Sequence, residues 1–343
     1  MSEDSDNGEG MTATPPQAGG TSRRAFVLGG AAIGAAGVIG GRRGPDVTAQ
    51  QRRRAGATAR PAAKVGSKAE VGATVSAGNP GGSTRLEAAQ IFDTNMGGRK
   101  MAMAVERVYW GPGKWQTGPN TTQEVATLNG AGIAIVGSFT PSQTLTNAEL
   151  TNLKNSLAQL KSQNAIVDAI CLTHEPNYQK FPSAQAYQKY INFYGPAVVE
   201  AGYALAYIPV VLTTAANDVA AFYPTGTLNG QPLVTRMYGD FYCSTQYTSG
   251  VRLDGFFNVA VAHNTPRVGI GEFGRTDSAL HPPTDQQFRS YTQYLTQEWQ
   301  AWNAAGHDSA VIMYFTNGAA NNPTPDNYLA LEALWDALSI DHT

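Results

Sequence analysis

The segment IVDAICLTHEPN, residues 166–177, decides the fold, because a run of apolar residues leads directly into a group of polar ones. The residues up to Thr173 have the composition of a strand that is buried on both faces. A second segment, VGIGEFG at residues 268–274, has the same construction. Both predict a strand whose carboxyl end carries a functional side chain, which is Glu175 in the first segment and Glu272 in the second.

Outward from these two segments, strand-like runs alternate with segments of helical period along the body of the chain. The eight strand candidates are residues 89–93, 105–110, 133–139, 166–173, 204–212, 236–242, 268–272 and 310–315. Eight alternations over about 250 residues predict a single α/β domain, a (β/α)8 or TIM barrel. A doubly wound open sheet is the alternative fold, but no glycine-rich phosphate fingerprint follows the first strand.

The helix predicted at residues 147–162 shows the helical pattern most clearly. Its leucines recur at helical spacing, and Thr146 with Glu149 forms a candidate capping box at its start. The helix that begins near residue 285 has the same construction, with Thr284 and Gln287 as the box. Each helix is expected to pack one apolar face on the barrel.

Two tryptophans, Trp299 and Trp302, fall in the apolar stripe of the helix that begins near residue 285. We therefore interpret them as core aromatics rather than as platforms for a sugar. A last helix at residues 328–338 would complete the barrel.

The charge pattern separates the body from its leader. From residue 86 onward the chain holds 13 Lys and Arg against 20 Asp and Glu, whereas residues 50–85 are basic. A phosphate backbone would repel an acidic body, so we expect no nucleic-acid partner. Charged residues are few overall, and the composition favours a neutral polar ligand.

The N-terminus has the pattern of an export signal. Residues 22–28 read SRRAFVL, which resembles the twin-arginine motif, and an uncharged apolar run follows at residues 25–41. The run is shorter than the roughly 18 to 20 strongly apolar residues of a spanning helix, so no permanent membrane anchor is expected. We predict a twin-arginine-type signal peptide at residues 1–49, a disordered linker at 50–85 and the catalytic domain at 86–343, in a secreted or extracytoplasmic protein.

The two cysteines and five histidines give no metal-ligand spacing. We interpret Cys171 and Cys243 as buried thiols, with a disulfide between them as the alternative. We predict that the protein uses no metal and no cofactor.

Glu175 and Glu272 indicate a function when they are considered together. Hydrolysis of a glycosidic bond needs one carboxylic acid that protonates the leaving oxygen and one carboxylate at the anomeric carbon. Strands four and seven of a barrel lie across its mouth from each other, which lets Glu175 and Glu272 face one sugar from opposite sides. Either glutamate alone would be read as a solvated or salt-bridged residue.

The segments THEPN (173–177) and IGEFG (270–274) resemble those of the retaining glycoside hydrolases of clan A, and most closely glycoside hydrolase family 26, the mannanases and related β-glycanases. That family carries its acid/base on strand four after a histidine and its nucleophile on strand seven. The resemblance implies that Glu175 is the acid/base, that Glu272 is the nucleophile, and that His174 orients the sugar or the nucleophile.

The resemblance also implies a tyrosine at the end of strand six that donates a hydrogen bond to the nucleophile, and Tyr242 in GDFY fits that place. A rim tyrosine without catalytic contact is the alternative for Tyr242. Further candidates for substrate binding are Trp110 and Trp115, whose faces could stack on pyranose rings, together with Asn177 and Arg107. Core packing is the alternative for the tryptophans, and a structural ion pair for Arg107.

The sequence departs from the family at two places. Strand eight ends in MYFTN (313–317), where family 26 has a tryptophan, and IFDTN (91–95) has no evident family counterpart. The identity of the sugar is therefore left open among the β-mannan, β-glucan and xylan classes.

Two functions from different classes follow. The first is a monomeric, secreted retaining glycoside hydrolase that cleaves a β-linked polysaccharide by double displacement. The second is a barrel of the cell surface that binds glycan without cleaving it. A metal-dependent hydrolase is a third option, against which the histidine spacing argues.

Overall fold

The computed structural model describes residues 70–74, 82–96, 103–104, 109–110, 119–178, 180–211, 216–243, 253–275, 284–307 and 309–315. The predicted signal peptide, the first part of the predicted linker and the predicted last helix lie outside these residues. Arg107 and Trp115 also lie outside them.

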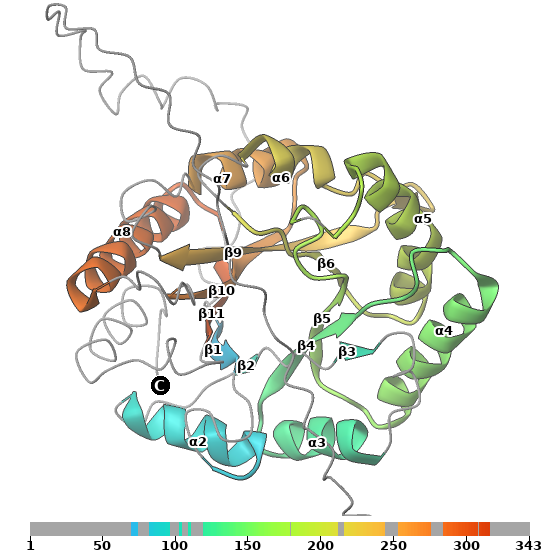
Figure 1. Ribbon diagram of the computed structural model, residues 1–343, viewed down its shortest axis with the longest axis horizontal. Coiled ribbons are helices and arrows are strands. Elements are labelled where there is room, and N and C mark those ends of the chain that lie inside the picture. The colour runs from blue at the N-terminus through green and yellow to red at the C-terminus, as the bar shows by residue number, and fades with distance from the viewer. Residues whose placement is uncertain are drawn as a thin grey trace, which may run out of the picture. The chain divides into compact units, whose positions relative to one another are not determined.

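A closed ring of eight parallel strands forms the centre of the domain (Figure 1). In chain order the ring strands are β1 (Glu70–Thr74), β2 (Met103–Ala104), β4 (Ala134–Phe139), β5 (Val167–Leu172), β6 (Leu205–Tyr207), β9 (Val234–Cys243), β10 (Arg267–Arg275) and β11 (Ser309–Phe315). Each strand pairs with its neighbours in parallel, and the pairing of β2 with β4 closes the ring. The prediction of a (β/α)8 barrel is therefore confirmed.

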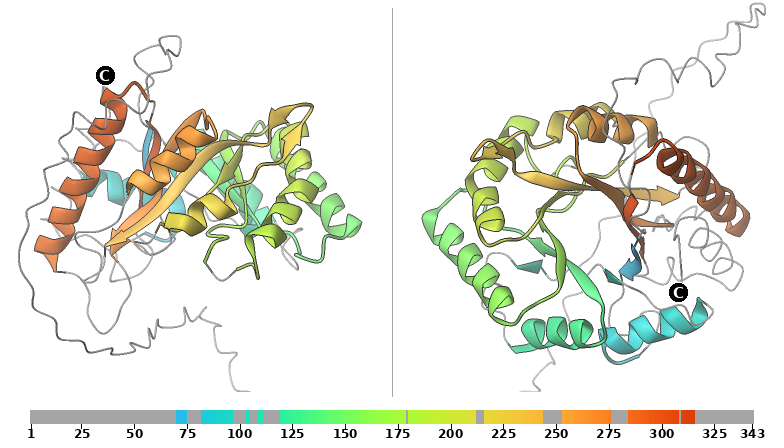
Figure 2. Two further views of the ribbon diagram at one scale, coloured as in Figure 1. Left: turned by 90° about the horizontal axis from the view of Figure 1, so that it is seen from above. Right: turned by 180° about the vertical axis from the view of Figure 1, so that it is seen from behind.

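The helices surround this ring, as Figure 1 and the view from behind in Figure 2 show. They are α2 (Arg85–Asn95), α3 (Pro119–Gly130), α4 (Asn147–Ser162), α5 (Ala184–Glu200), α6 (Ala216–Phe222), α7 (Leu253–Ala262) and α8 (Asp285–Ala304). One helix follows each of the first seven ring strands. By this count β5 is the fourth ring strand, β9 the sixth and β10 the seventh, as predicted.

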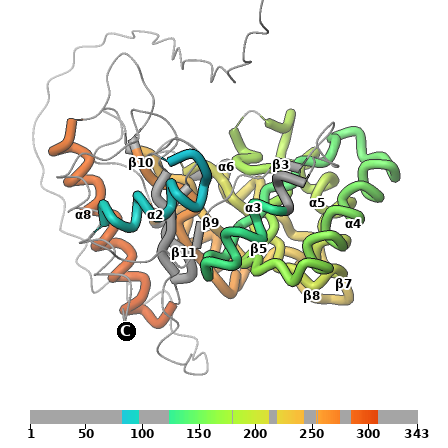
Figure 3. Tube along the Cα trace, turned by 90° about the horizontal axis from the view of Figure 1, so that it is seen from below, coloured from blue at the N-terminus to red at the C-terminus, as the bar shows by residue number. Residues whose placement is uncertain are grey.

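Short elements mark the two ends of the barrel. The strand β3 (Tyr109–Trp110) extends the second ring strand at its carboxyl end and pairs with β4. A hairpin of β7 (Thr227–Leu228) and β8 (Gln231–Pro232) precedes β9, and its Asn-Gly turn has positive φ at both residues. In the side view of Figure 3, this hairpin lies at one end of the barrel.

Two apolar layers hold the barrel together. The larger layer lies between the strands and the helices, and it includes Trp299, Trp302 and the leucines of α4. The smaller layer fills the barrel interior and is formed by Val136, Ala169, Cys171, Ala206, Ile208 and Tyr238. The predictions that Cys171 is a buried free thiol and that the two tryptophans belong to the core are confirmed.

The first predicted strand was wrong. Residues 89–93 belong to α2, and the first ring strand is β1, which lies within the segment predicted to be a linker. In α2 the buried side chains are Ala88, Ala89 and Phe92, a spacing that suits a helix. A capping box of Thr84 and Glu87 starts this helix.

Two further local predictions are corrected in part. Of the strand predicted at residues 105–110, the structure describes only the end, β3, and the second ring strand, β2, lies just before the predicted start. At the start of α4, Thr146 accepts from the backbone of Glu149, but the carboxylate of Glu149 accepts from Ser142 instead of completing the box. The full box of Thr284 and Gln287 on α8 is confirmed.

An ion cluster occupies the amino-terminal end of β5, β9 and β10. Asp168 on β5 accepts a hydrogen bond from the guanidinium of Arg267 at 3.0 Å and lies 3.9 Å from that of Arg236. The hydroxyl of Tyr238 also donates to Asp168. Burial, and then the charge of Asp168, raise the pKa of Tyr238, so this hydroxyl remains a donor. We call these four residues the basal cluster.

Among the described residues, no helix is long and apolar enough to cross a membrane.

Candidate active site

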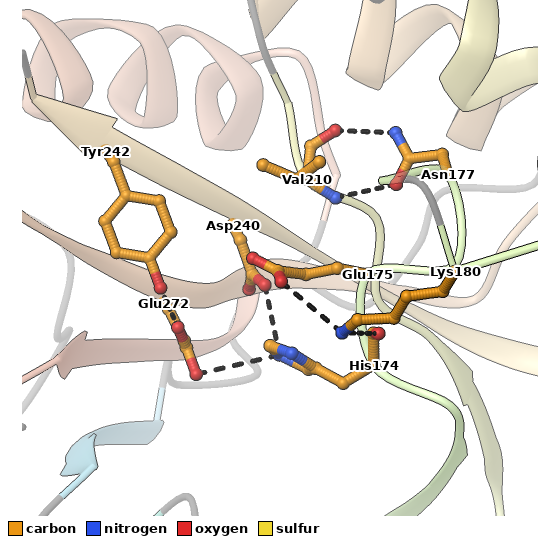
Figure 4. Close-up of polar contacts among 8 residues, drawn as sticks. All are labelled: His174, Glu175, Asn177, Lys180, Val210, Asp240, Tyr242 and Glu272. Atoms are coloured by element: carbon orange, nitrogen blue, oxygen red, sulfur yellow. Dashed lines mark hydrogen bonds and ion pairs between the residues drawn. The ribbon is translucent and has the colours of Figure 1, made fainter. Parts of the chain in front are cut away.

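The carboxyl ends of β5, β9 and β10 carry the candidate active site (Figure 4). Every second residue of β9 from position 236 shares the face that points into the barrel, namely Arg236, Tyr238, Asp240 and Tyr242. Tyr238 belongs to the interior layer, whereas Met237 and Phe241 belong to the layer under the helices. The alternation therefore places Asp240 and Tyr242 above the basal cluster, at the barrel mouth.

A bulge at Gly271 turns Glu272 towards the same mouth. Ile270 pairs with Gly239, and Glu272 pairs with the next residue on β9, Asp240, so β10 holds one extra residue between the two pairs. In a strand without this bulge, Glu272 would stand two positions after Ile270 and share its helix-facing side. A Cβ atom at position 271 would lie only 2.6 Å from Oδ1 of Asp240. The glycine of IGEFG thus makes room for a carboxylate and permits the change of face.

His174 connects two buried carboxylates. Its Nε2 lies 3.0 Å from Oδ2 of Asp240 and 3.6 Å from Oε1 of Glu272. The side chain of His174 is 2% exposed, and those of Asp240 and Glu272 are 0% exposed. Nε2 of His174 therefore faces both carboxylates, and Oδ2 of Asp240 is the nearer of the two oxygens. The segment after β5 therefore reaches the residue predicted to be the nucleophile.

Tyr242 donates a hydrogen bond to the other oxygen of Glu272, Oε2. Hydrogen bonds to a carboxylate stabilise its ionised form, and this offsets part of the cost of burying the charge. Glu272 thus accepts a hydrogen bond at Oε2 from strand six, and its Oε1 faces Nε2 of His174 at 3.6 Å, at the end of strand four. The contact between Tyr242 and the predicted nucleophile is the one that the family resemblance implied.

The segment that carries Glu175 has a constrained backbone. Thr173 and Glu175 both have positive φ, 64° and 51°, which is uncommon for residues other than glycine. Neighbouring strands hold this conformation, since the backbone N–H of Thr173 donates to Phe139 on β4 and that of Glu175 to Ile208 beyond β6. Strain of about 1 to 3 kcal/mol per residue persists only where the surroundings fix it, and it is concentrated at functional sites.

Hydrogen bonds fix the side chain of Thr173. Its hydroxyl donates to the hydroxyl of Tyr190, which in turn donates to the carbonyl of Pro141. Burial raises the pKa of Tyr190, so this relay stays protonated.

Asn177 ties the same segment to the residues that follow β6. Its amide nitrogen donates to the carbonyl of Val210 at 2.8 Å, and its amide oxygen accepts from the N–H of Val210 at 3.0 Å. Both the nitrogen and the oxygen of the Asn177 amide are thus hydrogen-bonded to the backbone of Val210. Asn177 therefore positions this loop, and its role in binding the sugar stays a prediction.

The two predicted carboxylates have different surroundings. Glu175 is 20% exposed and its Oε2 lies 3.5 Å from Nζ of Lys180, whereas Glu272 is fully buried beside Tyr242 and His174. A reachable carboxyl group can exchange protons with a substrate or with water, and an ionised, fixed carboxylate can attack. The arrangement therefore provides the two chemical functions that glycosidic bond cleavage needs.

Three groups here are also close enough to be considered as metal ligands. One ligand atom each from His174, Asp240 and Glu272 lies within 4.8 Å of the others. The spacing of the histidines in the sequence did not reveal this group. Nε2 of His174 faces both carboxylates, and Tyr242 donates to Glu272.

The structure brings together His174, Glu175, Tyr242 and Glu272, but it leaves other predictions open. Trp115 and Arg107 lie outside the described residues, and so does the side chain of Trp110. Sequence analysis missed Asp240 and Lys180. Asp240 could have been found, because it stands two residues before Tyr242 on the same face of a strand.

Comparison with solved structures supports the fold. A psychrophilic glycoside hydrolase family 10 endo-β-1,4-xylanase aligns over 80% of this chain and 98% of its own, with a TM-score of 0.52 and 12% identity. A double mutant of the endo-β-1,4-mannanase from Cellulomonas fimi aligns over 78% and 70%, with a TM-score of 0.51 and 13% identity. The chain has the (β/α)8 fold of these hydrolases.

A third similar structure is a glycoside hydrolase family 128 endo-β-1,3-glucanase from Amycolatopsis mediterranei in complex with laminaripentaose. It aligns over 79% of this chain and 99% of its own, with a TM-score of 0.46 and 13% identity. The sequence matches no protein-family model and no curated protein. At these identities the likeness concerns the fold, and the function has to be argued from the site.

Proposed function

We propose that this chain is a retaining glycoside hydrolase that cleaves a β-linked polysaccharide. The observation that carries the proposal is the buried cluster at the barrel mouth, where Glu272 is held between Tyr242 and His174 while Glu175 stands at the end of the fourth strand. Burial of two carboxylates beside each other is costly, and such an arrangement is typical of functional sites.

In the first step the Glu272 carboxylate attacks the anomeric carbon while the bond from that carbon to the leaving oxygen breaks. Glu175 donates its proton to the leaving oxygen, which departs as a sugar hydroxyl. The hydrogen bond from Tyr242 stabilises the ionised form of Glu272, and the neighbouring ring of His174 helps to hold it in place before the attack. The product is a glycosyl ester on Glu272.

In the second step Glu175, now a carboxylate, takes a proton from water. The water oxygen attacks the anomeric carbon, the ester bond breaks, and Glu272 is released as a carboxylate. The exposure of Glu175 suits this exchange with water. Two displacements on one carbon retain its configuration.

Mannan, β-glucan and xylan are the proposed substrate classes. Two similar structures are a β-1,4-mannanase and a β-1,4-xylanase, which supports an endo-acting enzyme of this kind. With the twin-arginine pattern at residues 22–28, we further propose that the enzyme acts outside the cytoplasmic membrane as a monomer.

One observation favours a second candidate, a barrel that binds glycan without cleaving it. Glu272 is fully buried, and both of its oxygens have partners. A carboxylate that stays covered in the complex cannot attack a sugar.

Release of reducing ends from β-mannan, laminarin, mixed-linkage glucan and xylan separates the two candidates. The wild type should cleave at least one polymer, and Glu175→Gln and Glu272→Gln should each lose about 10³-fold or more in kcat/KM. Activity should persist after dialysis against EDTA. Binding to a polymer without cleavage by the wild type would favour the second candidate.

A further inference from the structure

Lys180 contacts the candidate acid/base from the far end of its own loop (Figure 4). Its ammonium donates to the carbonyl of His174 and lies 3.5 Å from Oε2 of Glu175. The backbone of Lys180 is fixed as well, because Nε2 of Gln143, in the loop after β4, donates to its carbonyl at 2.7 Å. Lys180 therefore connects the loops that follow the third and fourth ring strands to the carboxyl group of Glu175.

This contact distinguishes the two oxygens of Glu175. An ammonium has three N–H donors and no acceptor, so the oxygen that faces it has to offer a lone pair. Oε2 faces Lys180, which leaves Oε1 to carry the proton of the acid form.

The contact contributes little to stability. The side chain of Lys180 is 38% exposed, and an exposed ion pair contributes about 0 to 1 kcal/mol. The orientation of a proton donor matters far more for a rate, because a misplacement of about 1 Å can cost about 10²-fold. The position of Lys180 is thus better explained by catalysis than by folding.

We propose that Lys180 is a positioning residue that orients Glu175 for proton transfer to the leaving group and assigns Oε1 as the donating atom. The proposal rests on the hydrolase function proposed above. Since Lys180 acts through the acid, its effect depends on how much protonation the leaving group needs.

The test compares two aryl β-glycosides of the disaccharide unit of whichever polymer the wild type cleaves. One has 2,4-dinitrophenol as its leaving group and departs without protonation, whereas the other has phenol and needs the acid. For Lys180→Met we expect kcat/KM to fall about 10-fold or more on the phenyl substrate and less than about 2-fold on the dinitrophenyl substrate. Lys180→Arg, which restores a cationic donor, should recover most of this loss.

The ratio of the two rates is taken within one protein preparation, so a misfolded fraction cancels. Lys154→Met is the matched control, because Lys154 is exposed on α4, and its ratio should equal that of the wild type. Equal losses of Lys180→Met on both substrates, or no loss on either, would overturn the proposal.

Glu175→Gln separates this proposal from the function on which it rests. If this variant shows the strong dependence on the leaving group and Lys180→Met does not, only the role of Lys180 fails. If the wild type cleaves no polymer or glycoside, both proposals fail.

Discussion

The two ends of β5, β9 and β10 carry polar clusters of opposite character. At the base, one carboxylate, Asp168, meets two guanidinium groups and a phenol, so attraction exceeds repulsion. At the mouth, two fully buried carboxylates, Asp240 and Glu272, share one imidazole. The same strands thus hold one cluster that stabilises the fold and one that destabilises it. A polar cluster that is present although it destabilises the fold indicates a functional site.

The bulge at Gly271 offers the strongest way to break this comparison. Gly271→Ala would place a Cβ atom 2.6 Å from Asp240 and 2.9 Å from the side chain of Ile208, so the carboxylates at the mouth have to move. We expect kcat/KM on the preferred polymer to fall about 10²-fold and the free energy of unfolding to fall by about 1 to 3 kcal/mol.

Gly130→Ala is the control for this change, since a Cβ at the end of α3 meets no atom within 4 Å. It should leave both quantities near the wild type. Wild-type activity in Gly271→Ala would contradict the role given to the bulge.

Removal of one charge at the mouth should separate activity from stability. In Asp240→Asn the shape is kept, but His174 loses the charge of the carboxylate whose Oδ2 lies 3.0 Å from its Nε2. We expect a loss of about 10- to 100-fold in kcat/KM, with a free energy of unfolding within about 1 kcal/mol of the wild type, because charge repulsion is relieved. Urea titration and initial rates measure both. A large fall in the free energy of unfolding with a normal kcat/KM would mean that Asp240 supports folding rather than activity, which contradicts this prediction.

The same substitution at the base should have the opposite outcome. Asp168→Asn leaves two guanidinium groups without their carboxylate. We expect the free energy of unfolding to fall by about 2 kcal/mol, a value reduced for the partial exposure of both arginines. Well below the melting temperature, kcat/KM should change less than about 2-fold. If this variant lost activity while remaining folded, the basal cluster would belong to the site.

The smallest effect is expected from His263, in the segment between α7 and β10. Its ring stacks on Tyr223 at 4.0 Å, and burial lowers its pKa. Below the ordinary histidine value of about 6.5 the unfolded chain therefore binds more protons than the folded one, so stability falls as the pH falls. His263→Phe keeps an aromatic ring without the titration. Its stability relative to the wild type should rise slightly from pH 7 to pH 5, and an unchanged difference would contradict this account.

Sequence reasoning located the later strands well for a physical reason. The fourth, sixth and seventh ring strands are buried on both faces, so their apolar runs are long and end sharply at polar residues. The first strand, EVGAT, is short and poor in large apolar residues, and it follows a leader of similar composition. The run at residues 89–93 is too short for its period to tell a strand from a helix, although the Thr84/Glu87 box before it favours the helix.

The site was predictable only in part. The glutamates, His174 and Tyr242 were found from motifs, and Asp240 was within reach of the same alternation. The bulge at Gly271 could not be predicted, because a shift of one residue leaves the sequence pattern unchanged. The same shift turns every later side chain to the other face of the strand. Lys180 contacts Glu175 through a loop in which Thr173 and Glu175 have positive φ. Neither residue is a glycine, so the sequence did not indicate this conformation.

Covalent trapping tests the central claim most directly. A 2,4-dinitrophenyl 2-deoxy-2-fluoro-β-glycoside of the preferred sugar loads an enzyme with a carboxylate nucleophile but slows the release of the intermediate. We predict that peptide mass spectrometry will find the fluoroglycosyl group on Glu272, and that Glu272→Gln will remain unlabelled. An adduct on another residue, or no adduct in an enzyme that hydrolyses the polymer, would contradict the account.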